Sequence, residues 1–335
     1  MTLWLVRAGR HGEREQVALQ HGVALIGWHE LDYDLSRVGS RDILKSEMAK
    51  VYAAEKERTI NNWATQVWTF VKEIQKGDLV VLPLKVQSGI AIGRVTGGYE
   101  YRKDMPSDAH HVHSVEWLKT LPRTAFDQDL LFSFGAYMTV CQIQRNDAEK
   151  RVQAILEGKK VVVAKGPQPE EMVESDIEQI AHDEIAKYIS QKFKGHELAT
   201  LVEAILQAEG YKVTERSKPG PDGGVDILAG RGQFGFDSPK ICVQVKSQDS
   251  ALDVTALRSL KGLLQDFGAD NGLLVSWGGF TGKLLDEARR SFFNIRLWDQ
   301  GRLVDALLEN YERVPDEVQA ELPLKRIWTL VREEE

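Results

Sequence analysis

Three polar side chains with the chemistry of a phosphodiesterase site stand close together in the C-terminal half of this chain. Asp226 ends the run Gly-Gly-Val-Asp at 223–226, and Gln244 and Lys246 lie two residues apart in an apolar, strand-like run. Side chains two residues apart in a strand share a face, so both can point at the group that Asp226 binds. A carboxylate, a second oxygen ligand and an ammonium around one point suit a magnesium site that hydrolyses phosphodiester bonds.

The elements that must position these side chains alternate between helix and strand from Gly195 onward. Helices alternating with short buried strands predict a mixed sheet covered on both faces. The sequence separation of 18 between Asp226 and Gln244 leaves room for a hairpin between two of the strands. The predicted helices are 197–209, 253–267, 281–292 and 302–311, and the predicted strands are 211–216, 225–229, 240–246, 271–277 and 295–298.

This part of the sequence, from about Gly195 to Tyr311, resembles the Mrr-type restriction endonuclease domain of the PD-(D/E)xK superfamily. The resemblance rests on the order of a helix, a Gly-Tyr strand, Gly-Val-Asp-Ile, Val-Gln-Val-Lys, a helix, an apolar strand and Gly-Gly-Phe-Thr. It implies an α/β nuclease fold in which Asp226 binds magnesium and Gln244 helps to hold the metal or a water. It also implies that Lys246 orients the attacking water and stabilises the pentavalent transition state.

The first helix departs from the family pattern. The family places a glutamate about eleven residues before the helix-ending glycine, where this chain has Ala199. Glu203 lies four residues further on the same helix face and is predicted to be the second acidic ligand, with Glu197 as the alternative. The other interpretation of Glu203 is a glutamate that faces solvent. Asp222 is expected to be a turn residue.

The N-terminal half predicts a separate, strand-rich domain. Its predicted strands are 2–7, 23–28, 79–85, 90–101, 113–118 and 140–143, with helices at 40–52 and 59–74. A linker with Gly-Pro and Gln-Pro breaks follows, and then a polar helix from about Pro169 to Phe193. The predicted organisation is an N-terminal domain over 1–157, a linker and connecting helix over 158–194, and a nuclease domain over 195–335.

The N-terminal half resembles, more loosely, the PUA-like superfamily that includes the EVE and YTH modules. The resemblance rests on Ile-Gly-Trp at 26–28, Gly-Asp-Leu-Val-Val-Leu-Pro at 77–83, and Gly-Arg-Val at 93–95 before Tyr-Glu-Tyr at 99–101. It implies an α+β fold built on a β-barrel, with a modified nucleobase held in an aromatic pocket.

A flipped base regains its lost stacking against aromatic faces. The aromatic candidates for the pocket are Trp28, Tyr99 and Tyr101, followed by Trp63 and Trp68; the alternative is that these rings fill the core. Arg94, Arg102 and Lys103 are candidates for contacts to the nucleic-acid backbone. The histidines at 110, 111 and 113 lack the spacing of a zinc site, so we expect an exposed loop or a phosphate contact there.

Composition and charge restrict the classes of protein. The net charge is −7. Residues 1–157 contain 20 basic and 20 acidic residues, so the net negative charge lies entirely in residues 158–335. Such a nuclease domain would bind a polyanion weakly unless a metal or another domain helped. No apolar run approaches the roughly 20 residues of a membrane span. Two cysteines provide neither a disulfide framework nor a zinc spacing, and a cytoplasmic location is expected.

Together these features predict a restriction-type DNA endonuclease that depends on base modification. The expected cofactor is Mg²⁺ and the expected partner is double-stranded DNA carrying a modified base. One active site cuts one strand, so a homodimer is expected for cleavage of both strands. Two alternatives stay open: a catalytically decayed DNA-binding or defence sensor, and a nuclease that acts on RNA.

Overall fold

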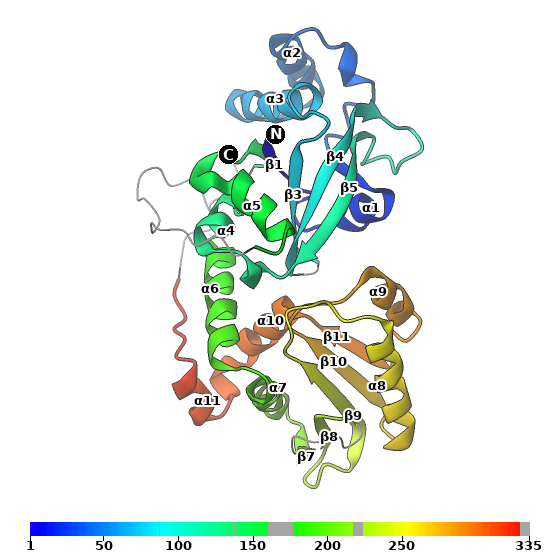
Figure 1. Cartoon of the computed structure of the whole chain (residues 1–335), viewed down its shortest axis with the longest axis vertical. Coiled ribbons are helices and arrows are strands. Elements are labelled where there is room, and N and C mark those ends of the chain that lie inside the picture. The colour runs from blue at the N-terminus through cyan, green and yellow to red at the C-terminus, as the bar shows by residue number, and fades with distance from the viewer. Residues whose placement is uncertain (87, 137, 160–176, 217–223, 329–335) are drawn as a thin grey trace. The chain divides into compact units, whose positions relative to one another are not determined.

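A computed structural model describes residues 1–86, 88–136, 138–159, 177–216 and 224–328 (Figure 1). The chain divides into two compact units. The first comprises residues 1–121, 126–180 and 330–335, and the second comprises 122–125 and 181–329. None of the helices in the described residues has both the length and the apolar character that crossing a membrane requires.

The first unit is built on a mixed six-stranded sheet in the order β2-β5-β4-β3-β1-β6. Strands β1 and β3 pair in parallel, and the other neighbours pair antiparallel. This order makes β2 and β6 the outer strands. The strands are β1 (Leu3–Val6), β2 (Val23–Ile26), β3 (Leu79–Leu84), β4 (Gly89–Tyr101), β5 (His111–Leu121) and β6 (Val140–Gln142).

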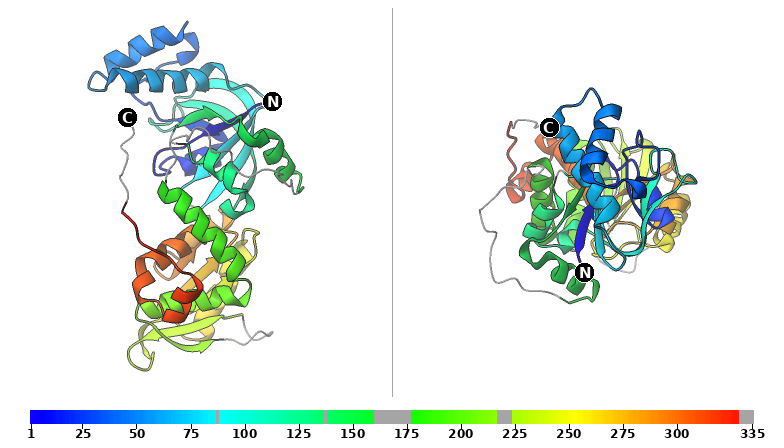
Figure 2. Two further views of the ribbon diagram at one scale, coloured as in Figure 1. Left: turned by 90° about the vertical axis from the view of Figure 1, so that its left-hand side faces the viewer. Right: turned by 90° about the horizontal axis from the view of Figure 1, so that it is seen from above.

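The sequence of β1 shows why this sheet has apolar cores on both faces. Leu3 and Leu5 alternate with Trp4 and Val6, and all four side chains are buried. The leucines pack with helices α4 (Gln128–Phe134) and α5 (Ala148–Leu156), whereas Trp4 and Val6 pack with α2 (Arg41–Val51) and α3 (Glu57–Lys72). Figure 2 shows α2 and α3 side by side over their face of the sheet. A further helix, α1 (Glu15–His21), packs with β2.

The second unit contains a five-stranded mixed sheet in the order β11-β10-β9-β8-β7. Strands β9, β10 and β11 run parallel, and β7, β8 and β9 form an antiparallel meander. The strands are β7 (Lys212–Arg216), β8 (Ile227–Arg231), β9 (Asp237–Lys246), β10 (Asn271–Ser276) and β11 (Ile295–Trp298). The predicted mixed sheet is confirmed.

Helices cover both faces of this second sheet. One face packs against α6 (Ile177–Lys192), α7 (His196–Ala208) and α10 (Gln300–Asn310). The other face packs against α8 (Val254–Asp266) and α9 (Gly282–Arg289). A short helix, α11 (Asp316–Glu321), adds Val318 to the first of these cores.

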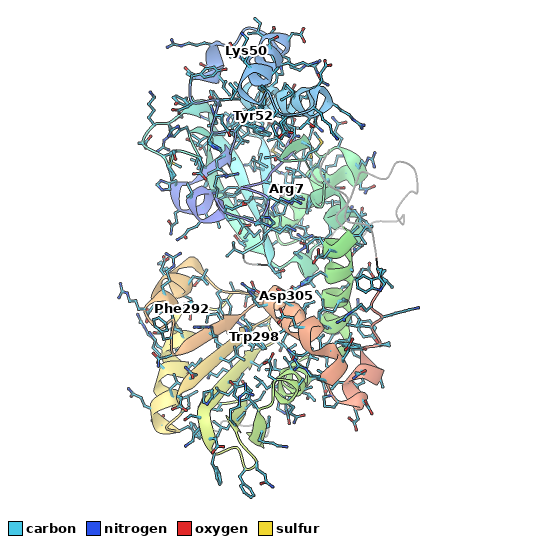
Figure 3. The ribbon with its side chains drawn as sticks, turned by 180° about the vertical axis from the view of Figure 1, so that it is seen from behind. Arg7, Lys50, Tyr52, Phe292, Trp298 and Asp305 are labelled. Carbon is cyan, nitrogen blue, oxygen red and sulfur yellow. The ribbon has the colours of Figure 1, made fainter. Side chains whose placement is uncertain are left out.

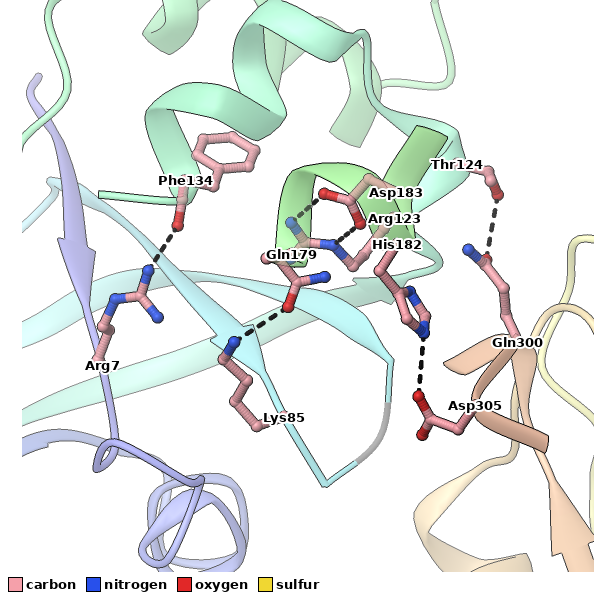
Figure 4. Close-up of polar contacts among 10 residues, drawn as sticks. All are labelled: Arg7, Lys85, Arg123, Thr124, Phe134, Gln179, His182, Asp183, Gln300 and Asp305. Atoms are coloured by element: carbon pink, nitrogen blue, oxygen red, sulfur yellow. Dashed lines mark hydrogen bonds and ion pairs between the residues drawn. The ribbon is translucent and has the colours of Figure 1, made fainter. Parts of the chain in front are cut away.

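The second unit includes a buried ion pair between Arg123 and Asp183. Both guanidinium nitrogens involved lie 2.5–2.6 Å from the carboxylate oxygens, and both side chains are 3% exposed (Figure 4). In the same unit His182 Nε2 lies 3.3 Å from Asp305 Oδ1. The segment 122–125 is therefore fixed to α6 by a charge-assisted, two-point contact.

Most predicted elements are present, with ends that differ by at most three residues. Helices α1, α4 and α5 were not predicted because they are only 7 to 9 residues long and interrupt strand-rich sequence. The predicted strand at 113–118 is longer and includes His111 and His113, which are buried. The expectation of an exposed histidine loop is therefore wrong for these two residues. Of the predicted polar helix, 177–192 is helical, and its first residues lie outside the described part of the chain.

Candidate active site

The three polar residues predicted from the sequence lie at the adjoining ends of two neighbouring strands in the interior of the second sheet. Asp226 immediately precedes β8, and Gln244 and Lys246 lie at the end of β9. The antiparallel register pairs Ile227 with Val243, which brings the start of one strand beside the end of the other. A separation of 18 residues in sequence thus becomes a contact between neighbouring strands.

Backbone hydrogen bonds hold Asp226 against β9. Its amide donates to Val243 O at 2.9 Å, and its Oδ2 accepts from the amide of Val245 at 2.7 Å. The two contacts lie on either side of Gln244 in the sequence. The carboxylate, which is partly exposed, is therefore fixed next to the Gln244 side chain.

The Gln244 amide is buried and only half satisfied. The residue is 3% exposed, and its Nε2 donates to Gly224 O at 2.6 Å. Its Oε1 is buried and has no hydrogen-bond partner in the described part of the chain. An unpartnered buried amide oxygen is costly, because it loses its hydration and gains nothing in return.

Lys246 lies on the same side of β9 as Gln244, at the point where the strand reaches the surface. The residue is partly exposed, and its ammonium has no ion pair or hydrogen bond with any residue that the structure describes. Its backbone pairs with Ser276 of β10 in the parallel register, and its carbonyl accepts from Trp277 N at 2.9 Å. The strand position is thus fixed while the ammonium is left available.

The packing shows which face of the sheet carries the site. Val243 and Val245 belong to the core that contains α7, whereas Cys242 belongs to the core that contains α8. Because side chains alternate along a strand, Gln244 and Lys246 share the face of Cys242, on the side of α8.

The acidic ligand predicted on the first helix lies on α7, which covers the opposite face. Ala199 is buried in the core, and Glu203 is partly exposed and accepts from Gln207 Nε2 at 3.1 Å. Glu197 is exposed at the start of the helix, and Asp222 lies outside the described residues. The roles of Glu203 and Glu197 therefore stay predictions.

Asp226 and Gln244 fit a hard divalent cation. The unpartnered Oε1 beside a fixed carboxylate offers two oxygen ligands of the kind that Mg²⁺ prefers, and Mg²⁺ commonly completes its shell with water and substrate phosphate. No cluster of three or more His, Cys, Asp or Glu side chains that could hold a metal ion occurs among the residues described. These donors therefore suit a Mg²⁺ ion that has few protein ligands, rather than a metal ion whose whole coordination shell comes from the protein.

The aromatic residues predicted to form a pocket in the first unit have structural partners. Trp28 is 9% exposed and packs edge-to-face against Trp63 at 6.3 Å between ring centroids. Trp63 in turn contacts Tyr52 at 5.2 Å, the residue labelled in Figure 3. Trp68, also in this core, lies under the ammonium of Lys72. This packing favours the core-filling alternative for Trp28 and Trp63.

Tyr99 is hydrogen-bonded to the loop that follows β2. Its hydroxyl accepts from Leu35 N at 3.3 Å and lies 2.7 Å from His111 Nδ1. His111 Nε2 lies 2.8 Å from Leu31 O. Because a carbonyl can only accept, Nε2 carries the proton and Nδ1 accepts from Tyr99. Burial lowers the pKa of His111, which favours this neutral form.

Tyr101 and the basic candidates lie nearer the surface. Tyr101 donates to Asp32 Oδ1 at 2.5 Å, and partial burial together with that hydrogen bond raises the pKa of Tyr101 to about 12. Arg102 is paired with Asp104 at 2.6 Å, and the Lys103 ammonium lies 5.9 Å from the Tyr101 ring centroid. Arg94 donates to Gly77 O at 3.3 Å. Of these, Lys103 is the cation that combines exposure with an adjacent aromatic ring.

Gly224 belongs to the Gly-Gly-Val-Asp run noted in the sequence, but no role was predicted for it, and no role was predicted for Asp32. Gly224 has φ +77°, and a Cβ there would lie 3.1 Å from Gln244 Nε2. The paired glycines before Val-Asp were the available signal for a backbone that L side chains rarely adopt. Asp32, which Tyr101 and His110 both contact, has no such signal, because the contacts come from distant strands.

Two family models match this chain, and one of them has a functional description. Residues 190–307 match a family model described as restriction endonuclease, Mrr_cat. The C-terminal part of the chain is a Mrr-type restriction endonuclease domain. Residues 4–142 match a domain of unknown function, DUF8426.

Among solved structures, the chain is similar to the MspJI restriction endonuclease in complex with a 27-mer oligonucleotide. The identity is 15% over 96% of this chain and 80% of that chain, with a TM-score of 0.36. It is also similar to the DNA modification-dependent restriction endonuclease AspBHI, at 14% identity over 80% of this chain and 74% of that chain, with a TM-score of 0.34. No curated protein matches the chain.

Proposed function

We propose that this chain is a restriction-type endonuclease that hydrolyses phosphodiester bonds of double-stranded DNA with Mg²⁺. The observation that carries the proposal is the buried Gln244 Oε1, which has no hydrogen-bond partner among the described residues and lies beside the fixed Asp226 carboxylate in a Mrr-type domain. The Lys246 ammonium, which is likewise without a partner among those residues, lies on the same face of β9. Mg²⁺ held by Asp226 and Gln244 would supply Lewis-acid stabilisation of the phosphate charge. Lys246 would hold the attacking water and offset the negative charge that develops at phosphorus.

The test of this proposal replaces Lys246 with Ala and measures cleavage of plasmid DNA with and without Mg²⁺. The matched control is Lys240→Ala, which removes an exposed lysine from the same strand and the same face six residues away. We expect loss of cleavage in Lys246→Ala and normal cleavage in Lys240→Ala. If the parent chain cuts no DNA of any modification state, the decayed-sensor alternative holds instead. Cleavage of RNA in preference to DNA would support the RNA alternative.

We further propose that the first unit is a PUA-like domain that reads a modified base and so makes cleavage depend on modification. The support is the sequence resemblance, together with Lys103 beside the Tyr101 ring at the surface of that unit. The full-length Lys246→Ala protein, titrated with duplexes that carry unmodified, methylated or hydroxymethylated bases, tests this. Equal affinity for all duplexes would refute modification reading without touching the nuclease proposal.

A homodimer is part of the same proposal, because one site per chain cuts one strand. Sedimentation of the full chain with and without a specific duplex measures this directly. A monomer that nicks only one strand would refute it.

A further inference from the structure

The hydrogen bond between Gln244 and Gly224 decides which end of the amide faces the candidate metal site. One amide heavy atom lies 2.6 Å from Gly224 O. A carbonyl oxygen accepts hydrogen bonds, so only the Nε2 end is attracted to it, and the Oε1 end would be repelled. The amide is thereby turned so that Oε1 is the atom without a partner among the residues that the structure describes.

Gly224 makes this contact possible through its backbone. Its φ of +77° belongs to the left-handed region that L side chains rarely adopt. A Cβ on this residue would lie 3.1 Å from Gln244 Nε2, so the amide would have to move by a few tenths of an ångström. Both the conformation and the space at Gly224 are therefore needed for the observed position of the amide.

The same geometry disfavours a glutamate at position 244. A glutamate carboxylate has no N–H to donate and would place an oxygen against Gly224 O. It would also bury a second negative charge beside Asp226, in a position where the residue is 3% exposed. Burial of a charge is costly unless a partner compensates it.

We propose that Gly224 is a positioning residue, whose carbonyl orients the Gln244 amide so that Oε1 is presented as a neutral ligand, and that this site requires glutamine rather than an acid at position 244. This inference rests on the proposed magnesium-dependent function for its metal. The orientation of the amide is a property of the protein alone and can be measured without metal or DNA.

The first variant is Gly224→Ala, compared with Gly268→Ala. Gly268 lies in the same unit, has φ +59°, and a Cβ there would meet nothing within 4 Å. Both substitutions therefore strain the backbone, but only Gly224→Ala disturbs the amide. Because groups that orient metal ligands typically affect metal affinity by about 10- to 100-fold, we expect Gly224→Ala to weaken Mg²⁺ binding by about tenfold or more. Gly268→Ala is expected to bind Mg²⁺ like the parent.

The second variant is Gln244→Glu, which adds the acid that the superfamily pattern would favour. We expect weaker Mg²⁺ binding by calorimetry and slower cleavage than in the parent. Tighter Mg²⁺ binding in Gln244→Glu would overturn the proposal, because it would show that glutamine only substitutes for an acid. Equal loss of Mg²⁺ affinity in Gly224→Ala and Gly268→Ala would overturn it as well.

A readout independent of metal separates this inference from the proposed function. In protein labelled with ¹⁵N-glutamine, the side-chain NH₂ resonance of Gln244 is assigned by its loss in Gln244→Glu. We expect slow hydrogen exchange of this NH₂ in the parent and in Gly268→Ala, and fast exchange in Gly224→Ala. Fast exchange in the parent refutes the orienting hydrogen bond. Slow exchange in a parent that neither binds Mg²⁺ nor cuts DNA supports the hydrogen bond but refutes the proposed function and the metal role built on it.

Discussion

The buried ion pair between Arg123 and Asp183 gives a quantitative prediction for the second unit. Both side chains are 3% exposed, and two hydrogen bonds of 2.5–2.6 Å join them. Removing one partner of such a pair leaves an uncompensated charge, which costs about 3–5 kcal/mol. In a unit of this size a change of 1 kcal/mol shifts the Tm by about 2–4 °C, so Asp183→Ala should lower the Tm of the second unit by roughly 6–20 °C.

Calorimetry of the full chain measures this shift, and hydrogen exchange of the α6 amides identifies the unit that melts. The double variant Arg123→Met with Asp183→Leu removes both charges and should recover most of the loss, since apolar replacements of a buried pair are often neutral or stabilising. Asp286→Ala is the control, because its contact with Arg289 is 3.9 Å long and exposed. Such pairs contribute little, so its Tm should stay close to that of the parent. A loss below about 1 kcal/mol in Asp183→Ala, or a double variant no more stable than the single one, would refute the reasoning.

Four further outcomes follow from burial and hydrogen bonding. Trp28→Ala should destabilise the first unit by about 3–5 kcal/mol in urea unfolding if the ring fills the core, and by much less if it lines an open pocket. Burial lowers the pKa of His113 below 6.5, so the unfolded chain binds more protons at this residue than the folded chain does. The free energy of unfolding should therefore fall as the pH drops below 6.5. In urea titrations at pH 5.5 and 7.5, His113→Asn should make the free energy of unfolding less dependent on pH. Asp299→Ala removes the acceptor for Arg302 N at 2.9 Å and should cost about 1 kcal/mol or more, as a lowered Tm of the second unit. Phe234→Ser should change stability by less than about 0.5 kcal/mol, because the ring is 71% exposed; a larger loss would show that the ring is covered in solution.

The sequence predicts the second sheet well because its strands are short, apolar and separated by clear turn or helix signals. Strand β11 was predicted with its observed ends, and α8 and β10 to within one residue at each end. The sequence also predicts that Gln244 and Lys246 lie at the end of a strand and on one face of it, because side chains alternate along a strand. Short helices such as α1 escaped prediction because one or two turns carry too little periodicity.

Contacts between distant segments could not be predicted. The direction of the Gln244 amide depends on a carbonyl 20 residues earlier in the chain, and no local pattern encodes which amide atom faces it. Packing decides which face of the sheet α7 covers, so the sequence alone could not show that α7, which carries Glu203, packs on the face of Val243 and Val245. For Trp28, apolar spacing is the same whether the ring fills a core or lines a cleft.

The hairpin of β8 and β9 has the candidate site at one end and an exposed turn at the other. Asp226 is held to β9 at its open end, whereas the register shifts near the other end, between Ala229 and Arg231, where the turn exposes Phe234 and Phe236. Insertions are best accepted at exposed turns whose backbone does not hold a functional group. The turn at 232–236 is therefore a natural attachment point for a fluorophore or an affinity tag that leaves the candidate site undisturbed.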